Sequence, residues 1–192
     1  MAEEKINDEL AANDDALIRL LQTEETRDAG FKQLIKQYQV RLYWHIRRIL
    51  PEHHDTNDVL QNTFIKVFRN IEQFKGEARL YTWLYKIATN EAITFLNAKK
   101  KRTVISMNDD DHTNWDEMLP AETDSTPAAD ILERLAQAIS RLPDKQRLVF
   151  NMRYYDELSY QQISQILGTS EGALKASFHH AVRKVEDFLK NY

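Results

Sequence analysis

Apolar residues recur along the first half of the chain at steps of three and four, the spacing of one face of an α-helix. The first long series spans residues 31–50, and Pro51 should end that helix because the residue before a proline is pushed out of helical geometry. A second helix is predicted to begin at Asp55, whose carboxylate can cap free amides. A third covers 80–96, and a short apolar series at 16–21 predicts a leading helix.

The periodicity stops at 103–128, where prolines, Ser, Thr and acidic residues replace it. Such a composition cannot bury enough surface to offset the entropy of ordering, so we predict a flexible acidic linker. After residue 128 the apolar spacing returns, and Pro143 should end the first helix of this half. The series predicts four helices, around 131–142, 148–152, 159–167 and 171–190. The chain is therefore predicted to be all-α, with two helical domains joined by a tether.

Composition agrees with a helical, soluble, cytoplasmic protein. Among 192 residues there are only four Gly and four Pro, too few for the frequent turns of an all-β fold. The absence of cysteine excludes disulfides, a Cys-zinc site and a thiol nucleophile. No apolar run approaches the roughly 18 residues that span a bilayer, and the acidic start does not resemble a signal peptide.

Charge is strongly segregated along the chain, although the net charge is only −4. The balance is −6 over residues 1–30, +8 over 31–102, −7 over 103–128 and +1 over 129–192. Because the field at a surface follows local charge, the near-neutral total does not argue against nucleic-acid binding. The acidic N-terminus could shield the basic block or could simply be disordered, and disorder is the better prediction.

Residues 158–175 carry the signals of a helix-turn-helix. Ser159 and Gln162 fit a capping box, and Gly168 stands where the turn needs a left-handed residue. Either Thr169 or Ser170 can then cap the next helix. The inner stripe of that helix is predicted to consist of Leu174, Phe178, Val182, Val185 and Leu189.

The outer face of the second helix carries side chains that can contact phosphates and base edges in a major groove, namely Lys175, Ser177, His179 and Arg183. A helical hairpin with an ordinary polar face is the alternative. Ser164 departs from the small apolar residue that is usual in the motif, but a serine can bond back to a carbonyl one turn earlier.

Residues 74–86 mix cations with aromatic side chains, a combination that binds single-stranded nucleic acid through phosphate contacts and base stacking. The glycine-containing loop at 74–78 could also accept an extruded base. The alternative is that Tyr81 and Trp83 belong to the core. For Trp83 alone this is the preferred interpretation, because neighbouring apolar residues share its face.

Three motifs in order, at 55–68, at 74–84 and in the last forty residues, resemble a bacterial RNA polymerase sigma factor of the extracytoplasmic-function (ECF) group. The resemblance covers residues 14–102 and 129–192. It implies an acidic tail at 1–13, sigma region 2 at 14–102, an acidic linker at 103–128 and sigma region 4 at 129–192. The protein would then bind core RNA polymerase, through the β′ clamp helices and the β subunit, and direct initiation at promoter DNA.

The resemblance also assigns roles to residues. Core polymerase would be bound by Asp55, Asp58, Val59, Leu60, Gln61, Phe64 and Phe68. The −10 element would be bound by Phe74, Lys75, Gly76, Glu77, Ala78, Arg79, Tyr81, Thr82, Trp83, Asn90, Lys99, Lys100, Lys101 and Arg102. The −35 element would be bound by Thr169, Ser170, Glu171, Gly172, Lys175, Ser177, Phe178, His179 and Arg183. The acidic linker would thread the polymerase channel as a mimic of nucleic acid, or would only keep the tether soluble. An anti-sigma factor, common in the group, would cover the surfaces that meet polymerase.

No chemistry for catalysis or a cofactor is predicted. His53, His54 and Asp55, or Asp109 to His112, could in principle bind a metal, but neither set has helical ligand spacing or a third ligand at a defined distance. Two other functions remain as alternatives. A free-standing helix-turn-helix regulator would leave the 74–83 segment unexplained, and a helical interaction protein would leave both the basic cluster at 99–102 and the Gly168 turn unexplained.

Overall fold

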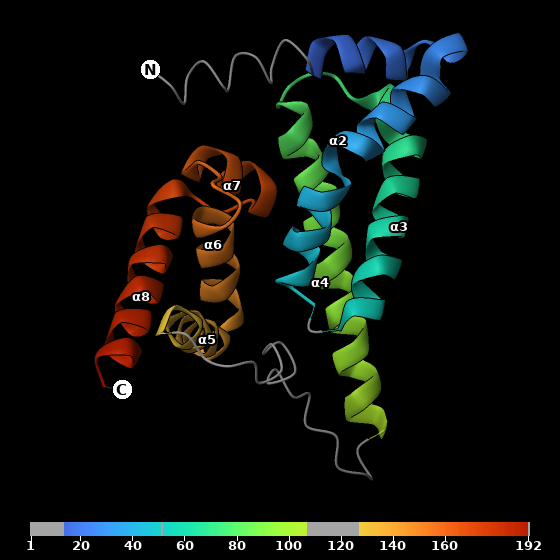
Figure 1. Cartoon of the computed structure of the whole chain (residues 1–192). Helices are drawn as coiled ribbons and strands as arrows, with labels where there is room; N and C mark the ends of the chain where they lie inside the picture. The colour runs from blue at the N-terminus through green and yellow to red at the C-terminus, as the bar shows by residue number, and fades with distance from the viewer. Residues whose placement is uncertain (1–13, 51, 107–126, 192) are drawn as a thin grey trace. The chain divides into compact units, whose positions relative to one another are not determined.

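The computed structural model describes residues 14–50, 52–106 and 127–191, and the regular elements within those ranges are all helical. The predicted all-α class is confirmed. The chain folds into two compact units, Met1–Phe95 and Leu96–Tyr192, so that the boundary between them falls inside one long helix. Figure 1 shows the helices of each unit.

The first unit begins with a helix at residues 14–22, as the short apolar series predicts. It is followed by η1 (Glu24–Thr26), α2 (Arg27–Arg47), α3 (His53–Asn70), η2 (Ile71–Gln73) and α4 (Leu80–Ser106). Figure 1 shows α2, α3 and α4 running alongside one another. Their facing apolar side chains form the core, which includes Leu34, Leu42, Ile46, Val59, Val67, Leu84 and Ala88.

Polar groups in this core are paired across helices. Nε2 of the buried His45 on α2 lies 2.8 Å from Oγ1 of Thr89 on α4. That hydroxyl donates to the carbonyl of Tyr85 at 2.7 Å. Near the start of the leading helix, the Tyr38 hydroxyl donates to Oδ1 of Asp14 at 2.6 Å. These bonds fix the register of the helices because a buried polar group without a partner is costly.

Three predicted boundaries in the first half of the chain differ from the structure. The helix expected at Asp55 begins at His53, with Glu52 at the N-cap position and no side-chain cap, so the capping role of Asp55 is wrong. The helix expected from residue 31 begins at Arg27. Helix α4 continues to Ser106, four residues into the segment predicted as linker. Most of that acidic segment, 107–126, lies outside the described residues.

Over the described residues 127–191, the second unit contains the helices α5 (Pro127–Ser140), α6 (Asp144–Tyr154), α7 (Tyr160–Leu167) and α8 (Glu171–Lys190). Its core brings α5, α6 and α8 together around Ala138, Ile139, Leu142, Phe150, Ala181 and Val185. The inner stripe predicted for α8 is wrong at Leu189, whose side chain is 37% exposed. The neighbouring Phe188 packs against the core instead.

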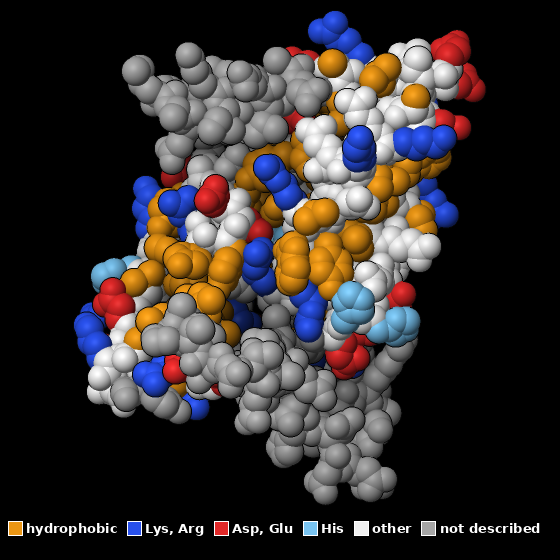
Figure 2. Space-filling view, viewed as in Figure 1, with side chains coloured by type: hydrophobic (Ala, Val, Ile, Leu, Met, Phe, Trp, Pro, Cys, Tyr) orange, Lys and Arg blue, Asp and Glu red, His pale blue; other side chains and the backbone are white. Residues whose placement is uncertain are grey.

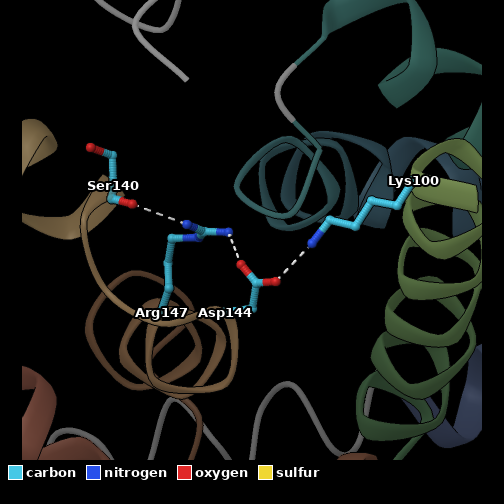
Figure 3. Close-up of polar contacts among 4 residues, drawn as sticks. All are labelled: Lys100, Ser140, Asp144 and Arg147. Atoms are coloured by element: carbon cyan, nitrogen blue, oxygen red, sulfur yellow. Dashed lines mark hydrogen bonds and ion pairs between the residues drawn. The ribbon is translucent and has the colours of Figure 1, made fainter. Parts of the chain in front are cut away.

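An arginine joins the end of α5 to the start of α6. The nearly buried Arg147 donates to the carbonyl of Ser140 at 3.1 Å and to Oδ1 of Asp144 at 2.7 Å, as Figure 3 shows. Burial lowers the pKa of the Arg147 guanidinium, and the Asp144 carboxylate opposes that shift. The Pro143 corner is therefore held by a cation with defined partners on both sides.

Within the described ranges, none of the helices has a stretch sufficiently long and apolar to span a membrane.

Candidate functional site

The turn between α7 and α8 has the predicted helix-turn-helix geometry. Ser159 Oγ accepts from the backbone N–H of Gln162 at 3.2 Å, and Gln162 Oε1 accepts from the backbone N–H of Ser159 at 2.7 Å. This reciprocal pair is the predicted capping box. Gly168 closes α7 in the left-handed region, with φ of 64° and its N–H donating to the Ser164 carbonyl at 2.8 Å.

Ser170, rather than Thr169, caps the next helix. Its Oγ accepts from the backbone N–H of Ala173 at 3.4 Å. The Thr169 hydroxyl points back to the Leu167 carbonyl at 3.5 Å. The start of α8 is thus defined by a glycine and a cap immediately before it.

The exposed face of α8 carries most of the predicted −35 residues. Glu171, Gly172, Lys175, His179 and Arg183 are exposed, and Ser177 is half-buried. Lys175 Nζ lies 3.8 Å from Oε2 of Glu171, one turn before it. The exception is Phe178, which packs inward.

Phe178 is directed to the core. Its ring stacks on Phe150 with centroids 5.8 Å apart and meets the edge of Tyr160 at 6.4 Å. It also packs against the buried cluster of the domain. A ring packed against the core in this way stabilises α8 and is directed away from the exposed face of the helix.

In the N-terminal unit, the aromatic residues of the 74–86 segment are more enclosed than a stacking platform requires. Phe74 is 8% exposed, and its ring packs against the half-buried Trp83 with centroids 5.2 Å apart. Thr82 is buried, and its hydroxyl has no hydrogen-bond partner. Tyr81 is half-buried and meets the ring of Tyr85 at 5.0 Å.

The polar part of the same segment reaches the surface. The exposed residues are Lys75, Gly76, Glu77 and Arg79, and Ala78 is half-buried. Asn90, on α4, is also exposed. Gly76 has φ of 74°, a conformation that side-chain-bearing residues rarely adopt. Further along α4, Lys99 is half-buried while Lys100 and Lys101 are exposed. The side chain of Arg102 lies outside the described residues.

The predicted polymerase-binding residues on α3 divide into two groups. Val59 and Phe64 are core residues, at 2% and 9% exposure. Asp58 and Gln61 are exposed, while Asp55, Leu60 and Phe68 are half-buried.

A shallow apolar hollow lies between α2 and α3. It is lined by Phe31, Ile35, Gln61, Phe64, Ile65, Phe68 and Arg69. The Phe31 ring closes one side, with its centroid 5.0 Å from that of Phe68 and 6.3 Å from that of Phe64. Sequence reasoning missed Phe31, Ile35, Ile65 and Arg69. Ile65 carried a usable signal, because it is an apolar residue outside the inner stripe of its helix, and it is 41% exposed.

Other large apolar side chains also reach the surface of the described part of the chain. They are Val40 and Trp44 on α2, Ile131 and Leu132 on α5, and Tyr154 and Tyr155 at the end of α6. Figure 2 shows hydrophobic side chains gathered in surface patches with lysine and arginine beside them. Exposed patches of this kind commonly mark protein–protein contacts.

The described residues form two helical units, and the second ends in a capped helix-turn-helix, a motif that many DNA-binding proteins use. Residues 34–102 match the family model for sigma-70 region 2, and residues 132–185 match that for sigma-70 region 4. The chain is 31% identical over 186 residues to the ECF RNA polymerase sigma-E factor of Haemophilus influenzae, covering 92% of this chain and 95% of that protein. It is 30% identical over 177 residues to the ECF RNA polymerase sigma factor SigW of Bacillus subtilis, covering 86% and 94%. The chain belongs to the ECF family of RNA polymerase sigma factors.

Solved structures agree on the fold. CnrH, in its complex with the cytosolic domain of CnrY, matches with a TM-score of 0.66 at 19% identity, over 93% of this chain and 97% of that one. The sigma factor RpoE of Bartonella quintana, in its complex with the anti-sigma factor NepR, matches with a TM-score of 0.65 at 22% identity, over 83% and 96%.

Family membership gives the general function. The protein binds core RNA polymerase and directs transcription initiation at promoter DNA. Sigma factors are initiation factors and not catalysts.

Proposed function

We propose that the two domains of this sigma factor divide promoter recognition between them, in the cytoplasm and on core polymerase. The N-terminal domain docks on the β′ clamp helices and captures an unstacked base of the −10 element. The C-terminal domain reads the −35 duplex with α8. The observation that carries this division is the exposed polar face of α8, whose start is fixed by Gly168 and Ser170.

The apolar hollow between α2 and α3 supports the docking step. Its floor is aromatic, its rim includes the exposed Ile65, and Gln61 and Arg69 add polar groups at the edge. Interfaces of this kind derive most of their affinity from a few apolar anchors in a desolvated centre with a polar rim. A side chain of the clamp helices would occupy the hollow. In the second domain, Ile131, Leu132, Tyr154 and Tyr155 are the exposed apolar residues available to the β subunit.

For the −10 step, the buried Phe74 serves as the anchor of the loop, and the exposed Lys75 and Arg79 approach the DNA. The loop turns at Gly76, which leaves room above its backbone because no atom lies within 4 Å of where a Cβ would be. Base capture there would offset the stacking and pairing lost on extrusion, a few kcal/mol per base. Melting in this scheme uses no hydrolysis.

For the −35 step, Lys175, His179 and Arg183 lie at spacings of four along α8 and are exposed. Such a face fits a major groove, with cations contacting phosphates and base edges. Glu171 at the start of the helix adds an acceptor that could pair with a cytosine amine.

The partners of the structural relatives suggest a regulator for this chain as well. The Bartonella RpoE was solved with an anti-sigma factor, and CnrH with the cytosolic domain of CnrY. We infer that an anti-sigma partner of this chain would compete for the apolar hollow, because the same groups are needed for polymerase docking.

The division is tested with Ile65→Asp and Lys175→Ala in the full chain. Ile65→Asp should weaken binding to core polymerase by about 100-fold, since it places a charge on the apolar lining of the hollow. Lys175→Ala should leave core binding unchanged and weaken −35-dependent transcription about tenfold. Fluorescence anisotropy with core polymerase and transcription from promoters with and without a −35 element give the two readouts. Loss of core binding by Lys175→Ala would contradict the division.

The free-standing regulator is tested with the same proteins. A regulator that acts alone would bind duplex promoter DNA tightly without polymerase. We expect the isolated chain to show only weak, salt-sensitive duplex binding, and core polymerase to be needed for specific binding.

A further inference from the structure

Tyr160, the first residue of α7, lies at the junction of three helices. The guanidinium carbon of Arg153, on α6, lies 4.9 Å from the centroid of its ring. Nζ of Lys175, on α8, lies 5.6 Å from the same centroid. The edge contact with Phe178 at 6.4 Å completes the surroundings of the ring.

Both cations are attracted to the ring because its face carries negative partial charge. Arg153 is fixed independently of the ring, since it donates to the carbonyl of Leu158, in the loop before α7. Its placement close to the ring leaves Lys175 as the cation whose position the ring can change.

Lys175 is otherwise held only weakly. Its side chain is 60% exposed, and its ion pair with Glu171 has an N···O distance of 3.8 Å across one helical turn. Exposed pairs of this kind contribute little, and a lysine side chain has many rotamers available. The Tyr160 ring on the neighbouring helix is the other group close to this ammonium.

We propose that Tyr160 is a positioning residue for base recognition: its ring, with Glu171, holds the Lys175 ammonium in one place over the −35 major groove. A lysine held in place contacts one base edge, whereas a freely rotating lysine distributes its charge over bases and phosphates. Tyr160 would therefore sharpen sequence preference more than it raises affinity. This inference rests on the proposed role of Lys175 in reading the −35 element.

The experiment uses the full chain assembled with core polymerase and a promoter library randomised across the −35 element. Each promoter of the library carries a transcribed barcode, and sequencing the barcodes in the transcripts gives the base preference at each position. Lys175→Ala identifies the position that Lys175 reads as the one where the preference collapses. Tyr160→Leu should reduce the preference at that same position about three- to fivefold and leave other positions unchanged. Tyr160→Phe, which keeps the ring, should retain most of it.

The double variant separates positioning from a structural role. In the Lys175→Ala background, Tyr160→Leu should cause no further loss at that position. Lys190→Ala, which removes the comparable Glu186–Lys190 pair at the far end of α8, is the matched control and should leave the profile unchanged.

Two results would overturn the inference in distinguishable ways. An equal loss from Tyr160→Leu in both backgrounds, or a uniform loss at every position, would show that the ring only stabilises the domain. An unaltered profile for Lys175→Ala would remove the proposed role of Lys175, and the inference would fail with it.

Discussion

Two glycine turns precede the two helices that carry the proposed DNA contacts, and they are built differently. Gly76 and Gly168 both have positive φ, 74° and 64°. The Gly168 turn is fixed by bonds between residues three or four positions apart, from the capping box of α7 to the Ser170 cap of α8. The 74–79 loop is held by the burial of Phe74 and by Gln22, whose Nε2 donates to the Phe74 carbonyl at 2.9 Å across 52 residues of sequence.

The contrast shows that similar turns can depend on local or on long-range contacts. A turn fixed by its own caps keeps its shape when the rest of the domain changes. A loop fixed by a distant helix depends on the packing of that helix. We therefore expect the 74–79 loop to respond to changes elsewhere in its domain and the Gly168 turn to be independent of them.

Phe74→Ala should have the largest effect. Removing a buried phenylalanine costs about 3–5 kcal/mol, and here it also releases the loop from Trp83. Native-state hydrogen exchange on the full chain should show lower opening free energies in the N-terminal domain and unchanged values in α7 and α8. An equal loss of opening free energy in both domains would contradict the expectation that α7 and α8 are independent of the N-terminal domain. Transcription from promoters that depend on −10 melting should fall with it.

Substituting alanine for Gly76 or Gly168 should have the next largest effect on stability. No atom lies within 4 Å of a Cβ at either position, so only the positive φ opposes the substitution. Gly168→Ala should cost about 1–2 kcal/mol in the opening of α7 and α8, because the surrounding caps hold φ in place. Gly76→Ala should cost less, since the exposed loop can relax.

Gly172→Ala is the matched control for these variants. Gly172 lies in the first turn of α8, also in open space but without positive φ. Alanine there should stabilise the helix by about 0.5–1 kcal/mol. A loss of similar size at all three glycines would mean that φ is not the cause.

Removing one hydrogen bond from each turn should give effects near 1 kcal/mol. Ser159→Ala deletes the capping box and should lower the opening free energy of α7 by about 1 kcal/mol. Gln22→Met keeps the side-chain length but removes the donor to Phe74, and should cost about 0.5–1.5 kcal/mol. Hydrogen exchange should place the second effect at residues 74–79, far in sequence from the substitution. An effect confined to the leading helix would contradict the anchoring.

The smallest expected effect is a pH dependence at the leading helix. Burial raises the pKa of the Asp14 carboxyl, although the hydrogen bond from Tyr38 opposes the shift. The folded chain therefore binds this proton more tightly than the unfolded chain, so the contribution of Asp14 to stability falls as pH rises from 3.8 through the folded pKa. Asp14→Asn should flatten that decline in denaturant unfolding, and Asp28→Asn, at an exposed residue that is not among the groups acting on Asp14, should not.

Local signals predicted the second domain best. The capping box, Gly168 and the helices of 159–190 are set by residues within a few positions of one another, so sequence spacing predicts them. Asp55 failed as a cap because helix α3 begins two residues earlier, at His53. The prediction for Leu189 failed because packing against the buried cluster of the domain decides between Leu189 and its neighbour Phe188. The Arg141 guanidinium, just after α5, also lies over the Phe188 ring.

The apolar hollow and the loop anchor could not be predicted in the same way. The hollow needs Phe31 from α2 and Ile65 from α3, and nothing in either helix alone indicates that they meet. Nothing in the sequence around Gln22 indicates that its side chain contacts the Phe74 carbonyl. The resemblance assigns Phe74 and Phe178 to DNA contacts, whereas packing directs both rings inward. For Phe178 the apolar spacing of its helix had already predicted an inward position.

The length of helix α4 sets the distance between residues at its two ends. From Leu80 at its start to Lys99 there are 19 steps in one unbroken helix, or about 29 Å at 1.5 Å per residue. That length corresponds to about eight or nine base-pair steps of 3.4 Å. If the 74–79 loop and these lysines contact DNA as proposed, the length of α4 sets the spacing between the two contacts. A one-residue insertion in the helix would lengthen it only slightly, but it would rotate the lysines by about 100° relative to Leu80 and should therefore weaken the proposed contact.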